Sequence, residues 1–345
     1  MMSADQRFMV LLACSLVVIV AVGAVTARDA GGESAGASAA PPGAEREVRA
    51  VLSRPAVQLR PHLVLRPLLT TNLADRFSWL ALEREPAPQP PILTDSQVVS
   101  YYGSLYTAEM GILGTADLET IVSRVEEHAA RYDALNGPTG VVPALHVVYA
   151  VAQPHPTSNG LYLQYVDDAD MHRLLHLTEE RKMLLFLDLQ IGRSSVEAEL
   201  EKVRAYLRYP QVHLAIDPEF AVGSEQVPGV NLGSLRAADI DKAQAALQEM
   251  VREEGLPPKL LIVHQFTDSM VEGGEAIQRY PDVELIVDMD GFGLAAIKRA
   301  TYQRYATRSY ASRAAIKLFF DHDPDLMSEE DVLDLVPRPA VVIYQ

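Results

Sequence analysis

The sequence predicts an α/β fold, a (β/α)8 TIM barrel, preceded by an N-terminal membrane segment and a proline-rich extension. Short apolar runs typical of buried parallel strands recur after residue 96, and helix-forming stretches lie between them. Several of these runs end in polar side chains two residues apart. Eight parallel strands joined by right-handed crossovers close into a barrel of about 250 residues, which fits residues 96–345.

The first 27 residues contain an uncharged apolar run, from Phe8 to Val25, of about the minimum length for crossing a bilayer. It is either a retained transmembrane anchor or a cleaved signal peptide, for which small residues up to Ala27 offer a cleavage site. A lipoprotein-like signal ending at Cys14 is a weaker alternative, because little apolar sequence precedes that cysteine. Each alternative makes the bacterial membrane a partner and places the rest of the chain outside the cytoplasm, in the cell envelope or secreted.

Two further segments precede the barrel. Residues 28–47 are mostly Ala, Gly, Ser and Pro, which cannot bury enough apolar surface to offset their ordering entropy, so a disordered linker is expected. Residues 48–95 contain more Leu and Val, together with the only tryptophan, Trp79, but prolines interrupt them throughout. Because prolines exclude a long helix or a central strand, this segment is predicted to be an extension packed on the barrel.

The elements of the barrel follow from periodicity. Apolar residues recur at the spacing of one helix face within 118–125 and again within 240–251. Ser194 with Glu197 forms an expected capping box, and Ser328 is expected to open the last helix. The eight expected strands lie near 98–103, 144–151, 183–189, 212–217, 259–265, 283–288, 314–319 and 340–344.

No eighth helix is expected, because the sequence stops just after the apolar run Val341 to Tyr344. Part of residues 48–95 is therefore predicted to cover the outer side of this strand. Gln345 is expected to lie near the mouth of the barrel, where the strands of such a fold present their functional side chains.

Composition narrows the classes of function. The formal charge of -16 argues against a nucleic-acid partner, because a phosphate-binding surface needs clustered Lys and Arg. The only cysteine is Cys14, so the barrel has no thiol nucleophile, thiolate metal site or disulfide. Its histidines lack the His-x-His and His-Glu-x-x-His spacings of common zinc hydrolases.

Polar side chains follow three expected strands at positions i and i+2, so each pair faces one side of its strand. In a parallel barrel such strand ends meet at one opening. The pairs are Asp188 with Gln190, Asp217 with Glu219, and Asp288 with Asp290; other strand ends add Tyr102, Tyr149, His264, Gln265, Lys317 and Tyr344 as substrate-binding candidates.

Crowded carboxylates repel one another as anions, so some are expected to have raised pKa values. A protonated acid beside an ionised one is what cleavage of a glycosidic bond requires, which makes a carbohydrate or another small polar ligand the expected partner. Glu219 is the candidate general acid because its side chain reaches further, and Asp217 would orient it. Asp288 or Asp290 is the candidate second carboxylate, acting as stabiliser or nucleophile, and no cofactor is needed.

Two other functions stay open. The oxygens of Asp188, Asp217, Glu219, Asp288 and Asp290 would also suit Mg²⁺, Ca²⁺ or Mn²⁺ in a metal-dependent hydrolase. The same acids would also hold ligand hydroxyls in a glycan- or partner-binding barrel without catalysis. Structural roles compete at each position: Asp-Pro-Glu can cap a turn, the aspartates before Gly291 and Gly293 can make turns, and buried barrel histidines such as His264 can belong to the core.

Some of these residues resemble known families. The pair Asp217-x-Glu219 at the end of the expected fourth strand looks like the acid-bearing strand end of chitinase-type and lysozyme-type glycoside hydrolase barrels, with His213 and Ala215 in place of further chitinase aspartates. Residues 97–345 are similar to exported bacterial (β/α)8-barrel proteins of unassigned activity. The resemblances imply a barrel located outside the cytoplasm, and a glycosidase-like acid at Glu219. The matching blocks are 110–114, 187–192, 217–220, 263–267 and 287–292.

Overall fold

The computed structural model describes residues 91–345. The membrane segment expected at 1–27, the linker at 28–47 and the extension up to residue 90 lie outside the described residues. Among residues 91–345 no helix is long and apolar enough to cross a membrane.

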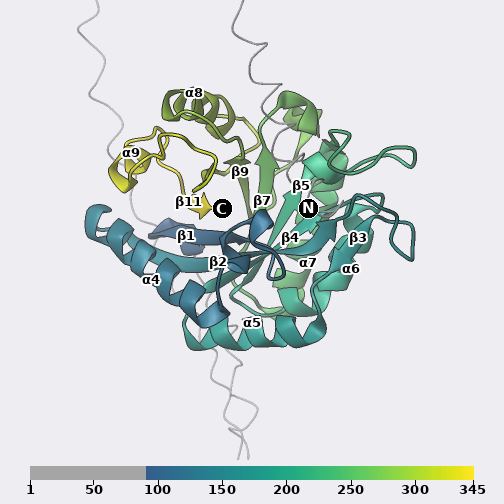
Figure 1. Cartoon of the computed structure of the whole chain (residues 1–345), viewed down its shortest axis with the longest axis horizontal. Helices are drawn as coiled ribbons and strands as arrows, with labels where there is room; N and C mark the ends of the chain where they lie inside the picture. Colours follow the sequence, from purple (N-terminus) through teal and green to yellow (C-terminus); the bar gives the residue numbers. More distant parts are fainter. Residues whose placement is uncertain (1–90) are drawn as a thin grey trace, which may run out of the picture. The chain divides into compact units, whose positions relative to one another are not determined.

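Eight parallel strands form a closed barrel, as the periodicity of the apolar runs predicts (Figure 1). The barrel closes because β1 pairs in parallel with both β2 and β11. A short strand, β3 (Leu163–Tyr165), adds antiparallel to β2 outside the barrel. The barrel strands are β1 (Ser96–Gly103), β2 (Gly140–Ala152), β4 (Leu184–Gln190), β5 (Val212–Asp217), β7 (Lys259–Gln265), β9 (Val283–Met289), β10 (Arg313–Leu318) and β11 (Val341–Tyr344).

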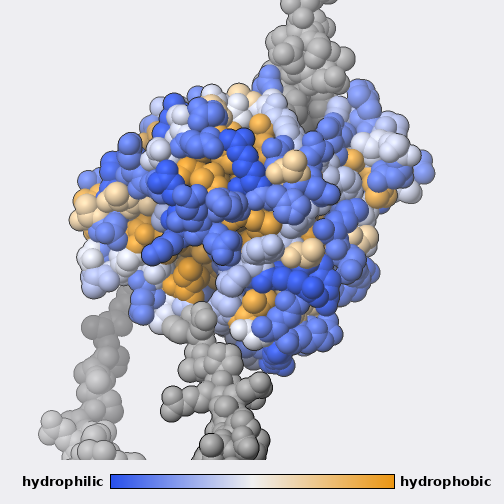
Figure 2. Space-filling view, turned by 90° about the horizontal axis from the view of Figure 1, so that it is seen from below, coloured by the Kyte–Doolittle hydropathy of each residue, from blue (hydrophilic) through white to orange (hydrophobic). Residues whose placement is uncertain are grey.

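Helices surround the barrel and bury their apolar faces against the strands (Figure 1). On the face of the molecule seen in Figure 2, hydrophilic residues predominate, and apolar residues are visible in hollows between them. The helices are α4 (Leu118–Leu135), α5 (Asp168–Glu180), α6 (Val196–Leu207), α7 (Ala237–Glu254), α8 (Ala295–Ala306) and α9 (Glu329–Leu333).

The connection from β7 to β9 departs from the expected alternation of strands and helices. It holds two 3-10 turns, η5 (Asp268–Met270) and η6 (Gly274–Ala276), and the two-residue strand β8 (Val271–Glu272), which pairs with β6 (Leu235–Arg236). Gly273 has a φ of 65°, and a Cβ on Gly274 would lie 2.6 Å from the Tyr310 ring. Adjacent glycines are poor helix formers, so the expectation of a helix here is wrong.

The helix caps refine two sequence predictions. Helix α6 begins at Val196 with Ser195 as its N-cap, and the Ser195 side chain accepts a hydrogen bond from the Ala198 amide. The expected capping box of Ser194 with Glu197 is therefore wrong: the N-cap lies one residue later, and Ala198 has no side chain that could complete a box. Ser328 caps α9 as predicted.

The space inside the barrel is mostly apolar in its lower part, where His213 is an exception, and polar toward the carboxyl ends of the strands. The short turn η1 (Ile92–Thr94) places Leu93 against the inward-facing Val98 and Val341, so this side chain closes the lower end of the barrel. The outer side of β11 packs against α4, where the hydroxyls of Tyr132 and Tyr344 lie 2.7 Å apart. Most of the extension predicted to cover this strand lies outside the described residues.

Strand parity decides which side chains enter the upper part of the barrel. On β4, Phe186 faces inward within an apolar cluster, so Asp188 and Gln190 at the following even positions face inward too. By the same alternation, Ala215 faces inward on β5, and so does Asp217 two residues later. Acids that are far apart in the sequence are thereby brought together around one axis.

Candidate active site

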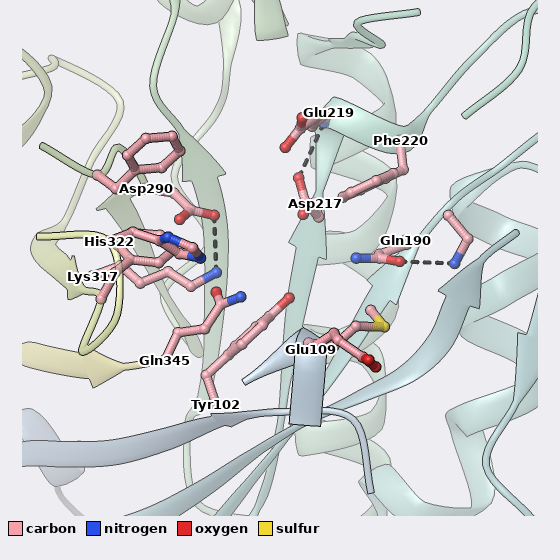
Figure 3. Close-up of a pocket in the computed structure, with 14 residues that line it drawn as sticks. Tyr102, Glu109, Gln190, Asp217, Glu219, Phe220, Asp290, Lys317, His322 and Gln345 are labelled. Carbon is pink, nitrogen blue, oxygen red and sulfur yellow. Dashed lines mark hydrogen bonds and ion pairs between the residues drawn. The ribbon is translucent and has the colours of Figure 1, made fainter. Parts of the chain in front are cut away.

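A cavity of about 130 Å³ opens at the carboxyl ends of the strands (Figure 3). Most of its polar residues stand at strand ends, and the rest of its wall comes from the loops that follow those strands. It is lined by Tyr102, Glu109, Met110, Ala152, Gln190, Asp217, Glu219, Phe220, Asp290, Phe292, Lys317, Phe319, His322 and Gln345.

Asp217 and Glu219 stand on one wall of the cavity (Figure 3). Strand β5 ends at Asp217, and the chain turns at once into a 3-10 turn, η4 (Pro218–Phe220). The Asp217 carboxylate accepts a hydrogen bond of 3.1 Å from the Glu219 amide, so Asp217 does cap this turn. The cap and a functional role coexist, because both side chains line the same cavity.

Both acids of this wall have raised pKa values. Burial raises the pKa of Asp217 to about 7. His264 opposes this shift, whereas the Asp188 and Asp290 carboxylates reinforce it. Burial and the neighbouring Asp217 and Asp290 carboxylates raise the pKa of Glu219 well above its usual range. Glu219 therefore keeps its proton near neutral pH, as a general acid requires.

Asp290 and Lys317 form the opposite wall, with Nζ of Lys317 3.1 Å from Oδ2 of Asp290. The Lys317 Nζ also lies 3.6 Å from the centroid of the Tyr102 ring, an arrangement that stabilises a cation. Burial would lower the pKa of Lys317, but the surrounding carboxylates, Asp290 foremost, raise it above its ordinary value. Lys317 is thus an ammonium ion that neutralises the acids.

Beneath this cavity lies a second, fully buried polar layer. Oδ2 of Asp188 is 3.4 Å from Nε2 of His264, and Nδ1 of His264 is hydrogen-bonded to Oδ2 of Asp288 at 2.8 Å. Burial alone would raise the pKa of Asp188, but the two imidazoles lower it to about 2, that of His264 more strongly than that of His146. Burial would likewise lower the pKa of His264, yet Asp188 and Asp288 raise it well above its ordinary value. Burial raises the pKa of Asp288.

His146 completes the buried layer from β2. Its Nε2 lies 3.8 Å from Oδ2 of Asp188, and burial lowers the pKa of His146 well below its ordinary value. Two sets of side chains in the described residues place potential ligand atoms within 4.8 Å of one another: His146, Asp188 and His264 form one set, and His264, Asp288 and Asp290 the other.

The structure divides the predicted site residues into three groups. The first group lies around the cavity and consists of Tyr102, Gln190, Asp217, Glu219, Asp290 and Lys317. A 2.7 Å hydrogen bond from the Ala152 amide fixes Gln190 there. Asp188, His264 and Asp288 point into the barrel below it and do not line it. Asp288 is therefore not placed to act as the second carboxylate.

Three predicted binding residues lie outside the barrel wall, so their assignment to the mouth is wrong. Gln265 accepts a 2.7 Å hydrogen bond from the Tyr310 hydroxyl. Tyr149 and Tyr344 belong to the apolar layer between strands and helices. The physical reason is parity: each directly follows an inward-facing residue, so its own side chain faces outward.

Sequence reasoning did not assign Glu109, Met110 and His322 to the site. Glu109 and Met110 lie in the loop after β1, and His322 lies in the loop after β10. Loops have no side-chain periodicity from which their orientation can be read. Of the phenylalanines that line the cavity, Phe319 directly follows β10, and Phe220 and Phe292 come shortly after β5 and β9, a signal that the sequence offers.

Comparison of the sequence with models of known protein families and with curated proteins gives no match. The function therefore has to be argued from the geometry and the chemistry of the two layers.

Proposed function

We propose that the barrel is a glycoside hydrolase, with Glu219 as the general acid and Asp290 as the second carboxylate. The observation that carries this proposal is the pairing of differently charged acids across one cavity. Glu219, whose pKa burial and neighbouring carboxylates raise well above its usual range, faces Asp290, which is ion-paired with Lys317. Glycosidases place a proton-donating acid on one side of the scissile bond and a carboxylate on the other.

The roles follow from the contacts of each group. Glu219 would donate its proton to the oxygen of the leaving sugar. The carboxylate of Asp290 would face the positive charge that develops on the sugar ring, while Lys317 holds that carboxylate in place at 3.1 Å. Asp217, which caps the turn that carries Glu219, orients the acid.

The other wall residues suit a carbohydrate. Phe220, Phe292 and Phe319 offer apolar ring surfaces against which a sugar face can pack. Gln190 and Gln345 offer amides that can donate and accept hydrogen bonds with hydroxyl groups. The expected substrate is therefore a neutral or hydroxyl-rich glycan of the cell envelope or the extracellular space, a location proposed from the apolar run before residue 27.

A metal-dependent hydrolase finds less support. The oxygen ligands considered for Mg²⁺, Ca²⁺ or Mn²⁺ are split between two layers: Asp217, Glu219 and Asp290 line the cavity, but Asp188 and Asp288 are buried beneath it. The two groups with converging ligand atoms both include His264, which has no exposed surface. An ion held by His146, Asp188 and His264 would lie beneath the cavity, because none of these residues lines it. In the other group, the Asp290 oxygen nearest His264 is already paired with Lys317.

The test is hydrolysis of a panel of chromogenic α- and β-glycosides and of envelope polysaccharides, with release of reducing ends as the readout. Glu219→Gln should lower kcat by about 10²- to 10⁴-fold, the usual contribution of a positioned general acid. Glu225→Gln is the matched control, because Glu225 is an exposed glutamate of the same β5–α7 connection and does not line the cavity.

Equal rates for Glu219→Gln and Glu225→Gln would contradict the proposal. Binding of a glycan by the wild type without any turnover would also contradict it, and would favour a non-catalytic glycan-binding barrel.

A further inference from the structure

The buried layer beneath the cavity contains three side chains that converge from neighbouring and facing strands. His146 comes from β2, Asp188 from β4 and His264 from β7, and none of them has any exposed surface. Oδ2 of Asp188 lies 3.4 Å from Nε2 of His264 and 3.8 Å from Nε2 of His146. Two imidazoles and one carboxylate therefore direct their ends at the same small region.

These contacts do not satisfy the hydrogen-bonding groups involved. Both oxygens of Asp188, both ring nitrogens of His146 and Nε2 of His264 are buried without a hydrogen-bond partner. Buried polar atoms are nearly always hydrogen-bonded, and the contacts of 3.4 and 3.8 Å with the imidazoles leave the Asp188 carboxylate without a hydrogen bond of ordinary geometry. Three side chains with unpaired atoms at a single point indicate a ligand that accepts electron pairs from all of them.

Two of the three separations between ligand atoms fit a metal ion, and the third, between the two imidazole nitrogens, is below 4.8 Å. Ligand atoms about 2.0–2.1 Å from a tetrahedral Zn²⁺ ion stand about 3.3 Å apart. The Asp188–His264 separation of 3.4 Å already matches this distance, and the Asp188–His146 separation of 3.8 Å needs to shrink by about half an ångström.

The second nitrogen of His264 supports the same assignment. Its Nδ1 is hydrogen-bonded at 2.8 Å to Oδ2 of Asp288, which leaves Nε2 directed at Asp188. Metal-binding histidines almost always use their other ring nitrogen in this way, with a carboxylate that fixes the ring. The alternative group of His264, Asp288 and Asp290 is less suitable, because the Asp290 oxygen nearest His264 is also the one paired with Lys317.

We propose that His146, Asp188 and His264 bind one divalent transition-metal ion inside the barrel. The distances between their ligand atoms assign this ion as Zn²⁺. Two imidazole ligands favour such an ion over Mg²⁺ or Ca²⁺, which take oxygen ligands. The ring of Tyr102, which lines the cavity, packs on both imidazoles with centroids 5.0 and 5.9 Å away. The ion is structural, since none of its three ligands lines the cavity, and its presence does not depend on the proposed glycosidase activity.

The test is the metal content of the untagged full-length chain, purified and also refolded with Zn²⁺, measured by inductively coupled plasma mass spectrometry. About one equivalent of zinc is expected, together with an X-ray absorption spectrum that shows nitrogen and oxygen ligands at about 2.0–2.1 Å and outer-shell scattering from imidazole. This spectrum is recorded on the wild type, so it does not depend on whether any variant folds.

His146→Gln should lose at least nine-tenths of the bound zinc. His213→Gln is the matched control, because His213 is another buried barrel histidine but is absent from the group of converging ligands, and it should retain the metal. Less than one tenth of an equivalent of zinc after refolding, an absorption spectrum without imidazole scattering, or equal zinc in both variants would each overturn the proposal.

Discussion

At the scale of single residues, the ionised carboxylate of Asp217 in the cavity destabilises the fold at neutral pH. Because the folded-state pKa of Asp217 is raised to about 7, the folded protein binds this proton more tightly than the unfolded chain does. The carboxyl therefore costs nothing well below pH 4, where both states are protonated, and destabilises the fold progressively as the pH rises from about 4 toward 7.

Asp217→Asn should consequently raise the melting temperature at pH 8 and leave it unchanged at pH 4, while lowering activity. Asn can still accept the hydrogen bond from the Glu219 amide, and each kcal/mol gained corresponds to about 2–4 °C for a domain of this size. Differential scanning calorimetry at both pH values checks this, with the exposed Asp334→Asn as control. The same gain at pH 4 as at pH 8 would show that the carboxyl's ionisation is not the cause.

Lys317 is a second residue with a measurable role in stability. Lys317→Met should reduce the free energy of unfolding by about 3–5 kcal/mol, because it leaves the buried Asp290 carboxylate without its cation. Arg173→Met, which breaks an exposed pair with Glu119, should cost far less than Lys317→Met, because solvent screens the exposed pair. Urea titration measures both variants, and similar losses for the two would contradict a special role for the buried pair.

Residue-level prediction from sequence succeeded where strand parity applies. The sequence predicts Asp217, Asp290 and Lys317 at the mouth because each stands an even number of residues after an inward-facing apolar residue of the same strand. It failed for Gln265 and Tyr344, which are one residue out of phase with the inward-facing positions. The convergence of His146 with His264 was not predictable, since it depends on which strands face each other across the closed barrel.

At the scale of elements, apolar periodicity was sufficient to predict eight strands, but it did not reveal that the β7–β9 connection lacks a helix. Steric contacts of one glycine help to fix that connection. The Cβ of Gly274→Ala would lie 2.6 Å from the Tyr310 ring, and Tyr310 donates a 2.7 Å hydrogen bond to Gln265 at the end of β7. The sequence shows two glycines here, but not the ring that packs against one of them.

Gly274→Ala should therefore destabilise the protein by about 1–3 kcal/mol, the usual cost of forcing extra atoms into a packed site. Gly223→Ala serves as control, because its Cβ would meet nothing closer than the Gln226 side chain at 3.4 Å. Chemical denaturation of the two variants measures the difference. A Gly274→Ala variant as stable as Gly223→Ala would mean that Tyr310 moves away at no cost.

At the scale of the whole molecule, the barrel separates stability from chemistry along its axis. The carboxyl ends of the strands carry the titratable side chains, whereas Leu93 and the inward-facing aliphatic residues fill the opposite end. In barrels of this type, changes at the lower end affect stability and changes at the upper end affect catalysis.

Leu93→Ala tests this separation, because Leu93 is only 6% exposed and does not line the cavity. The variant should lose about 2–5 kcal/mol of stability, the usual cost of removing a buried leucine side chain, and its melting temperature should fall accordingly. At 25 °C, where the variant is still folded, kcat on any glycan that the wild type hydrolyses should be unchanged. Leu232→Ala, at a leucine that is 38% exposed, should alter neither quantity. A Leu93→Ala variant that is fully folded but inactive would show instead that the lower end of the barrel controls the geometry of the acids above it.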